Sequence, residues 1–254
     1  MSDTVKIPAT TRVYAIADMH GRADLLARLL RAISKDAASH TDQRRILITL
    51  GDYIDRGANS NKVIETLIEL PLEDFEAKHL KGNHEEMLLD FLDDPLREGV
   101  LWLSNGGWAT LISYGLKVSD LPEDVEDLPV VRDKLLAVMP KEHLSFFKSL
   151  RLFYQLGDYY FVHAGVRPGV ALDKQKEDDL LWIRDEFLFS DKDFGKVVVH
   201  GHSISREPKE LKNRIGLDTG AFHTGTMTCL VLNGEERYFL QVKEGVPQPI
   251  KLQS

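Results

Sequence analysis

Apolar and polar positions follow one another in three copies of a single unit, which consists of a short strand, a polar loop and an amphipathic helix. The first strand is a continuous apolar run and the second is nearly so, as expected for strands that are buried on both faces. In each helix the apolar side chains recur every three or four positions. In the first copy the strand, loop and helix are expected at residues 13–17, 18–21 and 25–33. In the second copy they are expected at 46–50, 51–57 and 63–68, and in the third at 75–80, 81–85 and 87–92.

Strands that alternate with helices predict a sheet whose strands pair in parallel through right-handed crossovers. In such a sheet the loops at the carboxyl ends of the strands line one common crevice. The first three polar loops therefore bring several chemically active side chains to one edge, namely Asp18, His20, Asp52, Asp55, Arg56, Asn83 and His84.

The alternation stops at residues 93–150, where helical patterns are broken by prolines and by the acidic stretch 119–129. This segment is too short and too broken for a core of its own, so we interpret it as a helical insertion over the crevice within a single domain of residues 1–254. The tail from Lys243 contains prolines and is expected to form a surface extension. Further strands are expected at residues 152–155, 159–163, 196–200, 215–217, 227–232 and 238–242.

Composition narrows the class of protein. The chain has 254 residues, of which 43% are apolar, and a net charge of −8 without a run of basic residues, which argues against bulk nucleic-acid binding. Its first residues lack the apolar core of a signal peptide, and no apolar run reaches the length of a membrane span. With a single cysteine, the chain is expected to be a cytoplasmic protein without a membrane partner, and we expect a monomer.

Six oxygen or nitrogen donors in the polar loops point to a metal site. Carboxylate, imidazole and amide donors without a thiolate suit a hard or borderline divalent ion such as manganese, iron or zinc. Six donors are too many for one structural zinc, so a pair of ions sharing a bridging aspartate fits better. The donors are Asp18, His20, Asp52, Asn83, His163 and His202.

The loop Gly51-Asp52-x-x-Asp55-Arg56-Gly57 carries further chemistry. At average residue usage its five specified positions arise by chance roughly once per million starting points. Arg56 would pair bidentately with phosphate oxygens, and His84 would protonate a leaving oxygen while Asp55 orients the ring. This combination is typical of phosphoryl-group hydrolysis.

Three other residues have simpler interpretations. Cys229 has no arginine six positions later, so a thiol phosphatase is disfavoured and a buried core cysteine is expected. His200 stands two positions before His202 and is a weaker candidate ligand. Asp218 begins an Asp-Thr-Gly triplet that occurs only once, which favours a turn at a strand end over an aspartic protease dyad.

Five motifs resemble those of the phosphoprotein phosphatase branch of the calcineurin-like metallophosphoesterases, in the compact form found in bacteria and phages. Their order and spacing both agree with that family. Ala17 and Ala164 replace usual glycines, and Ile204 stands where the phosphodiesterases have a second histidine, which favours the phosphatase branch. The motifs are Asp18-x-His20-Gly21, Gly51-Asp52-x-x-Asp55-Arg56-Gly57, Gly82-Asn83-His84-Glu85, His163-Ala164-Gly165 and Gly201-His202.

The resemblance implies an α/β fold, a β-sandwich flanked by helices with a helical insertion near the active site. It also implies that Asp18 and His20 hold a first metal, that Asp52 bridges, and that a second metal is held by Asn83, His163 and His202. Arg56, Asn83 and Arg184 would bind substrate phosphate, and Asp55 and His84 would form the acid pair. Manganese is the expected ion in vitro, with iron or zinc as alternatives.

The resulting prediction is a metal-dependent phosphomonoesterase that acts on phosphoserine or phosphothreonine in proteins by attack of metal-activated hydroxide on phosphorus. Its partner would be a phosphoprotein or a small phosphorylated substrate. The first alternative is a symmetrical bis(5'-nucleosyl)-tetraphosphatase, because that family shares the same motifs. A second alternative is a catalytically silent binding module, but such a module predicts eroded motifs, whereas every expected metal ligand, His84 and both arginines are present here.

Overall fold

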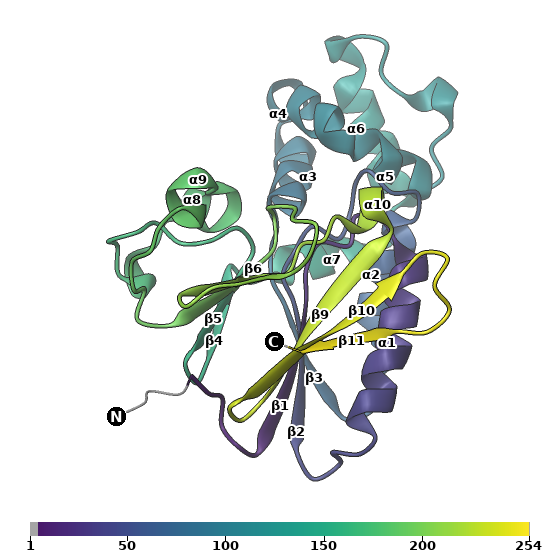
Figure 1. Ribbon diagram of the computed structural model, residues 1–254. Coiled ribbons are helices and arrows are strands. Elements are labelled where there is room, and N and C mark those ends of the chain that lie inside the picture. Colours follow the sequence, from purple (N-terminus) through teal and green to yellow (C-terminus); the bar gives the residue numbers. More distant parts are fainter. Residues whose placement is uncertain (1–4, 254) are drawn as a thin grey trace.

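The computed structural model describes residues 5–253 and shows two β-sheets packed face to face, with helices on their outer faces (Figure 1). The first sheet has six strands in the order β11-β10-β9-β1-β2-β3, and the second has five in the order β4-β5-β6-β8-β7. The strands of the first sheet are β1 (Thr11–Ile16), β2 (Arg44–Thr49), β3 (Phe75–His79), β9 (Thr226–Asn233), β10 (Glu236–Lys243) and β11 (Ile250–Gln253), and those of the second are β4 (Phe153–Leu156), β5 (Tyr159–Val162), β6 (Val197–His200), β7 (Lys209–Glu210) and β8 (Arg214–Gly216).

The three repeated units form half of the first sheet. Strands β1, β2 and β3 pair in parallel, as the alternating pattern predicts, and β9 pairs antiparallel with β1 on the other side. The crossovers between the parallel strands are helices α1 (Ala23–Ala37) and α2 (Ser60–Glu69), and helix α3 (Asn83–Asp93) follows β3. The carboxyl ends of the three parallel strands consequently lie side by side.

Strand β1 is buried on both faces, which explains its uninterrupted apolar sequence from Val13 to Ile16. Tyr14 and Ile16 belong to the core beneath α1 and α2, whereas Val13 and Ala15 belong to the core between the two sheets, where they join Phe161 of β5. Successive side chains of a strand point to opposite faces, so both cores receive alternate residues of one strand. The α/β sandwich predicted from the sequence is confirmed.

The outer face of the second sheet is covered by two short helices that the apolar pattern did not predict. Helices α8 (Glu177–Trp182) and α9 (Asp185–Leu188) place Leu180 and Phe187 against Tyr160 and Val198. Helix α10 (Ala221–Thr224) lies between β8 and β9 and is also absent from the prediction.

Residues 95–149 form the predicted helical insertion. Figure 1 shows α3, α4, α5 and α6 gathered at one end of the first sheet. Its α-helices are α4 (Pro95–Trp102), α5 (Trp108–Ser113), α6 (Leu128–Val138) and α7 (Lys141–Ser149), and the chain is kinked between α4 and α5 at Gly106, which has a φ of +103°.

The C-terminal tail differs from the prediction. It was expected to be a surface extension, but residues 250–253 form β11 and pair antiparallel with β10 at the edge of the first sheet. The alternation of Ile250 and Leu252 with polar residues is too short to predict a strand without the neighbouring one. Within residues 5–253, no helix combines the length and apolar character that crossing a membrane requires.

Candidate metal centre

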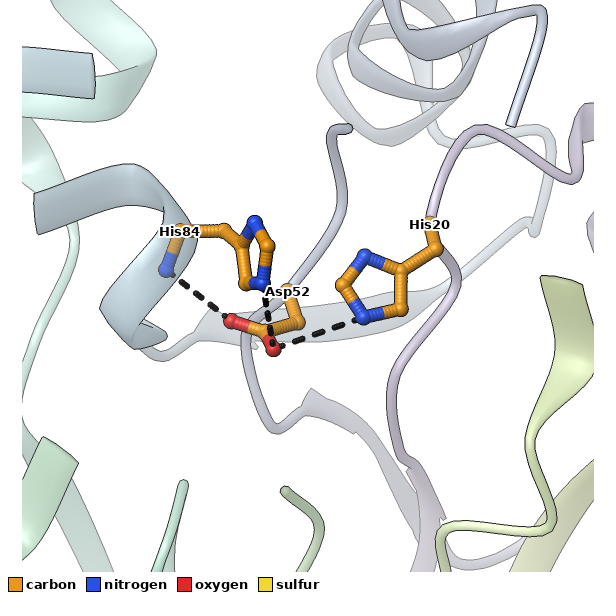
Figure 2. A group of neighbouring side chains, drawn as sticks. All are labelled: His20, Asp52 and His84. Carbon is orange, nitrogen blue, oxygen red and sulfur yellow. Dashed lines mark hydrogen bonds and ion pairs between the residues drawn. The ribbon is translucent and has the colours of Figure 1, made fainter. Parts of the chain in front are cut away.

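The loops that follow strands of both sheets meet at one site. Asp18 and His20 follow β1, Asp52 follows β2, and Asn83 begins α3, whereas His163 and His202 follow β5 and β6 of the second sheet. All six side chains are buried. Nitrogen and carboxylate atoms come together in two groups, His20 with Asp52 and His84, and Asp52 with His163 and His202. Asp52 belongs to both groups, and Figure 2 shows it between His20 and His84.

Backbone carbonyls orient two of the histidine rings. The Nδ1 atom of His20 lies 2.8 Å from the carbonyl oxygen of Ile54, and its Nε2 atom lies 3.5 Å from Oδ2 of Asp52. His163 is held in the same way, because its Nδ1 atom lies 2.9 Å from the carbonyl oxygen of Leu50. A neutral histidine that donates from Nδ1 presents the lone pair of Nε2, which is the arrangement that metal-ligating histidines use.

The donor set fits a cation. The Nε2 atom of His163 lies 2.9 Å from Oδ1 of Asn83 and 3.3 Å from Oδ1 of Asp52, so a lone pair faces two acceptor oxygens. His202 also has a buried Nε2 atom that finds no hydrogen-bond partner among residues 5–253. A positive ion among these atoms would satisfy all of them, whereas unpaired buried acceptors are costly.

The pKa shifts of the buried side chains also favour a bound cation. Burial raises the pKa of Asp52 well above its ordinary value, and the nearby charge of Asp18 raises it further. Burial also lowers the pKa of His163 to about 3 and that of His202 below its ordinary range. The protein therefore disfavours both carboxylate charge and imidazolium charge here, and a bound divalent cation would stabilise the deprotonated forms of both groups.

Asp18 connects the two sheets. Its Oδ1 and Oδ2 atoms accept hydrogen bonds from the backbone N–H of His202 at 3.0 and 3.2 Å. Asp18 is not a member of either group of close metal-binding atoms, whereas His84 is. The structure thus brings all six predicted donors into one site but places His84 nearer than Asp18 to the pair His20 and Asp52.

Backbone strain is concentrated at this site. Among the described residues, seven that are not glycine have positive φ, and five of them belong to the predicted site: His20, Asp52, Asp55, Arg56 and His202. Such conformations cost of order 1–3 kcal/mol each and persist only where surrounding structure enforces them. The loop that carries Asp52 is packed closely against Gly82, because a Cβ on Gly82 would lie 2.2 Å from Oδ1 of Asp52. Only glycine fits at this position.

His84 and Asp55 form a buried pair beside Asp52. The Nδ1 atom of His84 lies 2.6 Å from Oδ2 of Asp55, and its Nε2 atom lies 3.9 Å from Oδ2 of Asp52. Burial raises the pKa of Asp55 to about 7 and lowers the pKa of His84 to about 3. Hydrogen bonds from Thr110 and Trp102 oppose the shift at Asp55 by favouring its charged form.

Two arginines adjoin the site from different elements. The Nη1 atom of Arg56 donates a hydrogen bond to Nε2 of His20 at 3.0 Å, and its guanidinium lies 4.9 Å from the centre of the Phe222 ring. Arg184, at the start of α9, donates from Nη1 to the carbonyl oxygen of His202 at 3.1 Å. Both side chains are exposed, so both guanidinium groups are accessible to an anionic ligand.

Five residues lie at the site although the sequence prediction gives them no function there. Glu85 holds backbone N–H groups of the Asp52 loop, and Phe222 covers Arg56 and His20. Asp218 does form the expected turn, because its Oδ1 atom accepts from the N–H of Gly220, but its charge also raises the pKa of Asp18. The signal available for Asp218 was its position directly after the strand expected at residues 215–217. The others are Trp102 and Thr110.

Two of the simpler interpretations agree with the structure. Cys229 is buried and free. His200 is buried away from the two groups of metal-binding atoms, with its Nε2 atom 3.2 Å from Nη1 of Arg214 and its ring packed against Phe187.

The sequence of residues 11–222 matches the family described as Calcineurin-like phosphoesterase. The chain belongs to this family. Among curated relatives, this phosphoesterase is 25% identical over 240 residues to the bis(5'-nucleosyl)-tetraphosphatase PrpE [asymmetrical] of Bacillus cereus (strain Q1), covering 85% of this chain and 88% of the relative. It is 28% identical over 228 residues to serine/threonine-protein phosphatase 2 of Salmonella typhimurium, covering 85% of this chain and 90% of the relative.

A solved structure shares the fold. The cold-active protein-tyrosine phosphatase of a psychrophile, Shewanella sp., superimposes on this calcineurin-like phosphoesterase with a TM-score of 0.60 and 17% sequence identity, over 96% of this chain and 80% of that one. The family and the clustered His and Asp side chains together identify a phosphoesterase able to bind metal at two adjoining positions.

Proposed function

We propose that this phosphoesterase is a metal-dependent phosphomonoesterase that hydrolyses phosphoserine and phosphothreonine in proteins. The observation that carries the proposal is the His84–Asp55 pair, 2.6 Å apart and adjoining the carboxylate of Asp52 that both groups of metal-binding atoms share. A proton donor beside a metal centre suits the expulsion of a poor leaving group such as an alkoxide.

The donor geometry and the family resemblance support one assignment of the metal ligands. Asp18 and His20 would hold one ion, Asp52 would bridge, and Asn83, His163 and His202 would hold the other, with manganese as the ion used in vitro. When bound, two divalent ions supply Lewis-acid stabilisation of phosphoryl oxygens and lower the pKa of water.

The remaining steps belong to the side chains of the chain itself. Arg56 and Arg184 would hold the non-bridging phosphate oxygens through their guanidinium groups, with Asn83 as a further phosphate contact. The His84–Asp55 pair would hold one added proton, which the raised pKa of Asp55, about 7, favours. With Nδ1–H directed at the Asp55 carboxylate, the imidazolium form of His84 would give its Nε2 proton to the leaving oxygen and be left as neutral imidazole, and the pair would then regain a proton from water. This assignment gives each group one function.

Exposed apolar side chains on the insertion, which contacts Arg56 through its backbone, support a polypeptide substrate. The backbone N–H of Arg56 donates to the carbonyl oxygen of Gly106 at 3.2 Å, so the insertion adjoins the phosphate-binding arginine. Trp108 is 53% exposed and Leu101 is 47% exposed on this insertion. Exposed apolar side chains of this kind often mark binding surfaces, and the Salmonella relative is a protein phosphatase.

A second candidate is hydrolysis of dinucleoside tetraphosphates. It is favoured by the similarity to the Bacillus cereus protein, which is named an asymmetrical enzyme, whereas sequence motifs alone suggested the symmetrical type. The exposed indole of Trp108 would suit a nucleobase as well as a peptide. Product identity separates the two types, because asymmetrical cleavage gives two unequal nucleotides and symmetrical cleavage gives equal ones.

The primary experiment is hydrolysis of p-nitrophenyl phosphate with added manganese, compared between the wild type and Asp52→Asn. Activity that needs metal in the wild type and disappears in Asp52→Asn supports the proposed phosphomonoesterase. Absence of metal-dependent activity, or full activity in Asp52→Asn, contradicts that proposal. A phosphopeptide panel and diadenosine tetraphosphate are then compared by kcat/KM. A far higher value for the dinucleotide would replace the protein-phosphatase proposal.

A further inference from the structure

The carboxylate of Asp55 is held by two side chains of the helical insertion. Thr110 donates from Oγ1 to Oδ1 of Asp55 at 2.6 Å, and Trp102 donates from Nε1 to Oδ2 at 3.0 Å. His84 meets the same Oδ2 atom at 2.6 Å. All four side chains are buried, so water cannot replace any of these partners. The orientation of Asp55 toward His84 is therefore set from the insertion.

The backbone of Asp55 is held from the same side. Its N–H donates to Oγ1 of Thr110 at 2.9 Å, and Oγ of Ser60 lies 3.1 Å from the same nitrogen. Asp55 has a φ of +71°, a conformation that needs such support in a residue other than glycine. One hydroxyl group of Thr110 thus contacts both the main chain and the side chain of Asp55.

The indole of Trp102 has little freedom to move. Its ring packs against Phe91 with 4.7 Å between the ring centres and a tilt of 31°, and a Cβ on Gly107 would lie 2.5 Å from the indole. Gly107 therefore leaves the space that the ring occupies. A donor fixed in this way points the N–H at Asp55 in one direction only.

We propose that Trp102 and Thr110 are positioning residues, which aim the Asp55 carboxylate at Nδ1 of His84 and thereby make proton transfer to the leaving group depend on the insertion. The inference deepens the proposed phosphomonoesterase function and rests on it. Neither residue touches a metal-binding atom group or a phosphate-binding arginine.

Leaving-group dependence tests the proposal, because a phosphate ester with a poor leaving group needs the proton more than one with a good leaving group. Thr110→Val and Trp102→Phe remove one donor each while keeping most of the volume. We expect both to lower kcat about tenfold or more on phenyl phosphate and much less on p-nitrophenyl phosphate, with KM changed by less than about twofold. Thr110→Ser keeps the hydroxyl and should restore the wild-type ratio.

Tyr114→Phe is the matched control for the insertion. It removes a buried hydrogen bond of 2.9 Å between Tyr114 and His143, within the same segment but without contact to Asp55. It should leave the ratio of the two substrates unchanged. Equal loss on both substrates in Thr110→Val and Trp102→Phe would indicate a purely structural role and overturn the proposal.

A double-mutant comparison adds a second criterion. If Thr110 acts through Asp55 and His84, then Thr110→Val should cost little in a His84→Asn background, whereas independent effects would multiply. Full additivity would overturn the proposal.

A measurement without turnover separates this inference from the proposed function. In zinc-loaded protein, the hydrogen-bonded Nδ1–H proton of His84 should give a far-downfield NMR signal, assigned by its loss in Asp55→Asn. The signal should weaken or shift in Thr110→Val and Trp102→Phe and persist in Tyr114→Phe. An unchanged signal in the first two variants would refute the positioning role. Absence of any phosphomonoesterase activity would refute the proposed function while leaving this result interpretable.

Discussion

The carboxylate of Glu85 accepts a hydrogen bond from the backbone N–H of Asp52 at 2.8 Å. The same carboxylate accepts from Tyr53 at 2.8 Å and from Gly82 at 3.0 Å, so one buried side chain joins the loop after β2 to the loop after β3. These loops carry Asp52 and Asn83. The distance between two metal-binding side chains therefore depends on a residue that donates nothing to the metal.

Replacement of Glu85 by glutamine should loosen that junction. The amide keeps one acceptor oxygen but turns an NH₂ group toward backbone donors, at a cost of about 1–3 kcal/mol. We expect metal affinity to fall roughly 10- to 100-fold, measured by metal titration followed through stability or isothermal calorimetry. Glu69→Gln, on the exposed surface of α2, is the control. Equal metal affinity in Glu85→Gln and the wild type would contradict this role.

His84→Asn should retain both metal ions and slow turnover by roughly 10² to 10⁴. The asparagine removes the proton donor and leaves the six assigned ligands intact. Elemental analysis gives the metal content and steady-state kinetics gives kcat. Loss of an ion in this variant would show that His84 is a ligand, which its position beside His20 and Asp52 also permits.

Phe222→Ala should weaken phosphate binding. The ring lies 4.9 Å from the guanidinium of Arg56, a cation–π contact worth about 0.5–1 kcal/mol at an accessible site. We expect KM and the inhibition constant of inorganic phosphate to rise about two- to fivefold with a smaller change in kcat. Phe189→Ala removes a ring that is 83% exposed and should change neither quantity. An unaltered inhibition constant in Phe222→Ala would argue against this contact.

A buried network distant from the metal centre predicts pH-dependent stability. Burial opposes the charge of Asp36, but hydrogen bonds from Tyr238, Tyr14 and Arg12 outweigh it and lower the pKa of Asp36 below its ordinary value. A carboxylate with a lowered pKa stabilises the fold above its unfolded-state pKa of about 3.9, and this stability is lost as pH falls through the lower folded-state value.

Asp36→Asn should therefore be less stable than the wild type by roughly 3 kcal/mol at neutral pH, because Arg12 loses its buried partner. The difference should shrink as the pH falls below about 4. Urea unfolding at several pH values measures it. A difference independent of pH would mean that the charge of Asp36 contributes nothing.

The parts of the fold that were predictable are those encoded by neighbouring residues. The three strand–loop–helix units repeat within about 80 residues, and β1 is apolar at every inner position because it faces two cores. Side chains at the carboxyl ends of parallel strands must lie near one another, which is why Asp18, Asp52 and Asn83 could be grouped from the sequence alone.

The parts that were not predictable depend on contacts between distant segments. Thr110 reaches Asp55 across 55 residues, and Phe222 reaches Arg56 from a short helix near the C-terminus. Neither contact leaves a periodic pattern, because a single hydroxyl or ring carries each one. The turn predicted at Asp218 is present, and its place after the carboxyl end of β8 also brings the charge of Asp218 close to Asp18.

The division of the ligands between the sheets has a consequence for unfolding. Asp18, Asp52 and Asn83 come from the first sheet, whereas His163 and His202 come from the second. An ion held by both groups would act as a cross-link between the two halves of the sandwich, so neither half could open while the ion stays bound. Metal-loaded protein should then melt in one cooperative step at a higher temperature than the chelated protein.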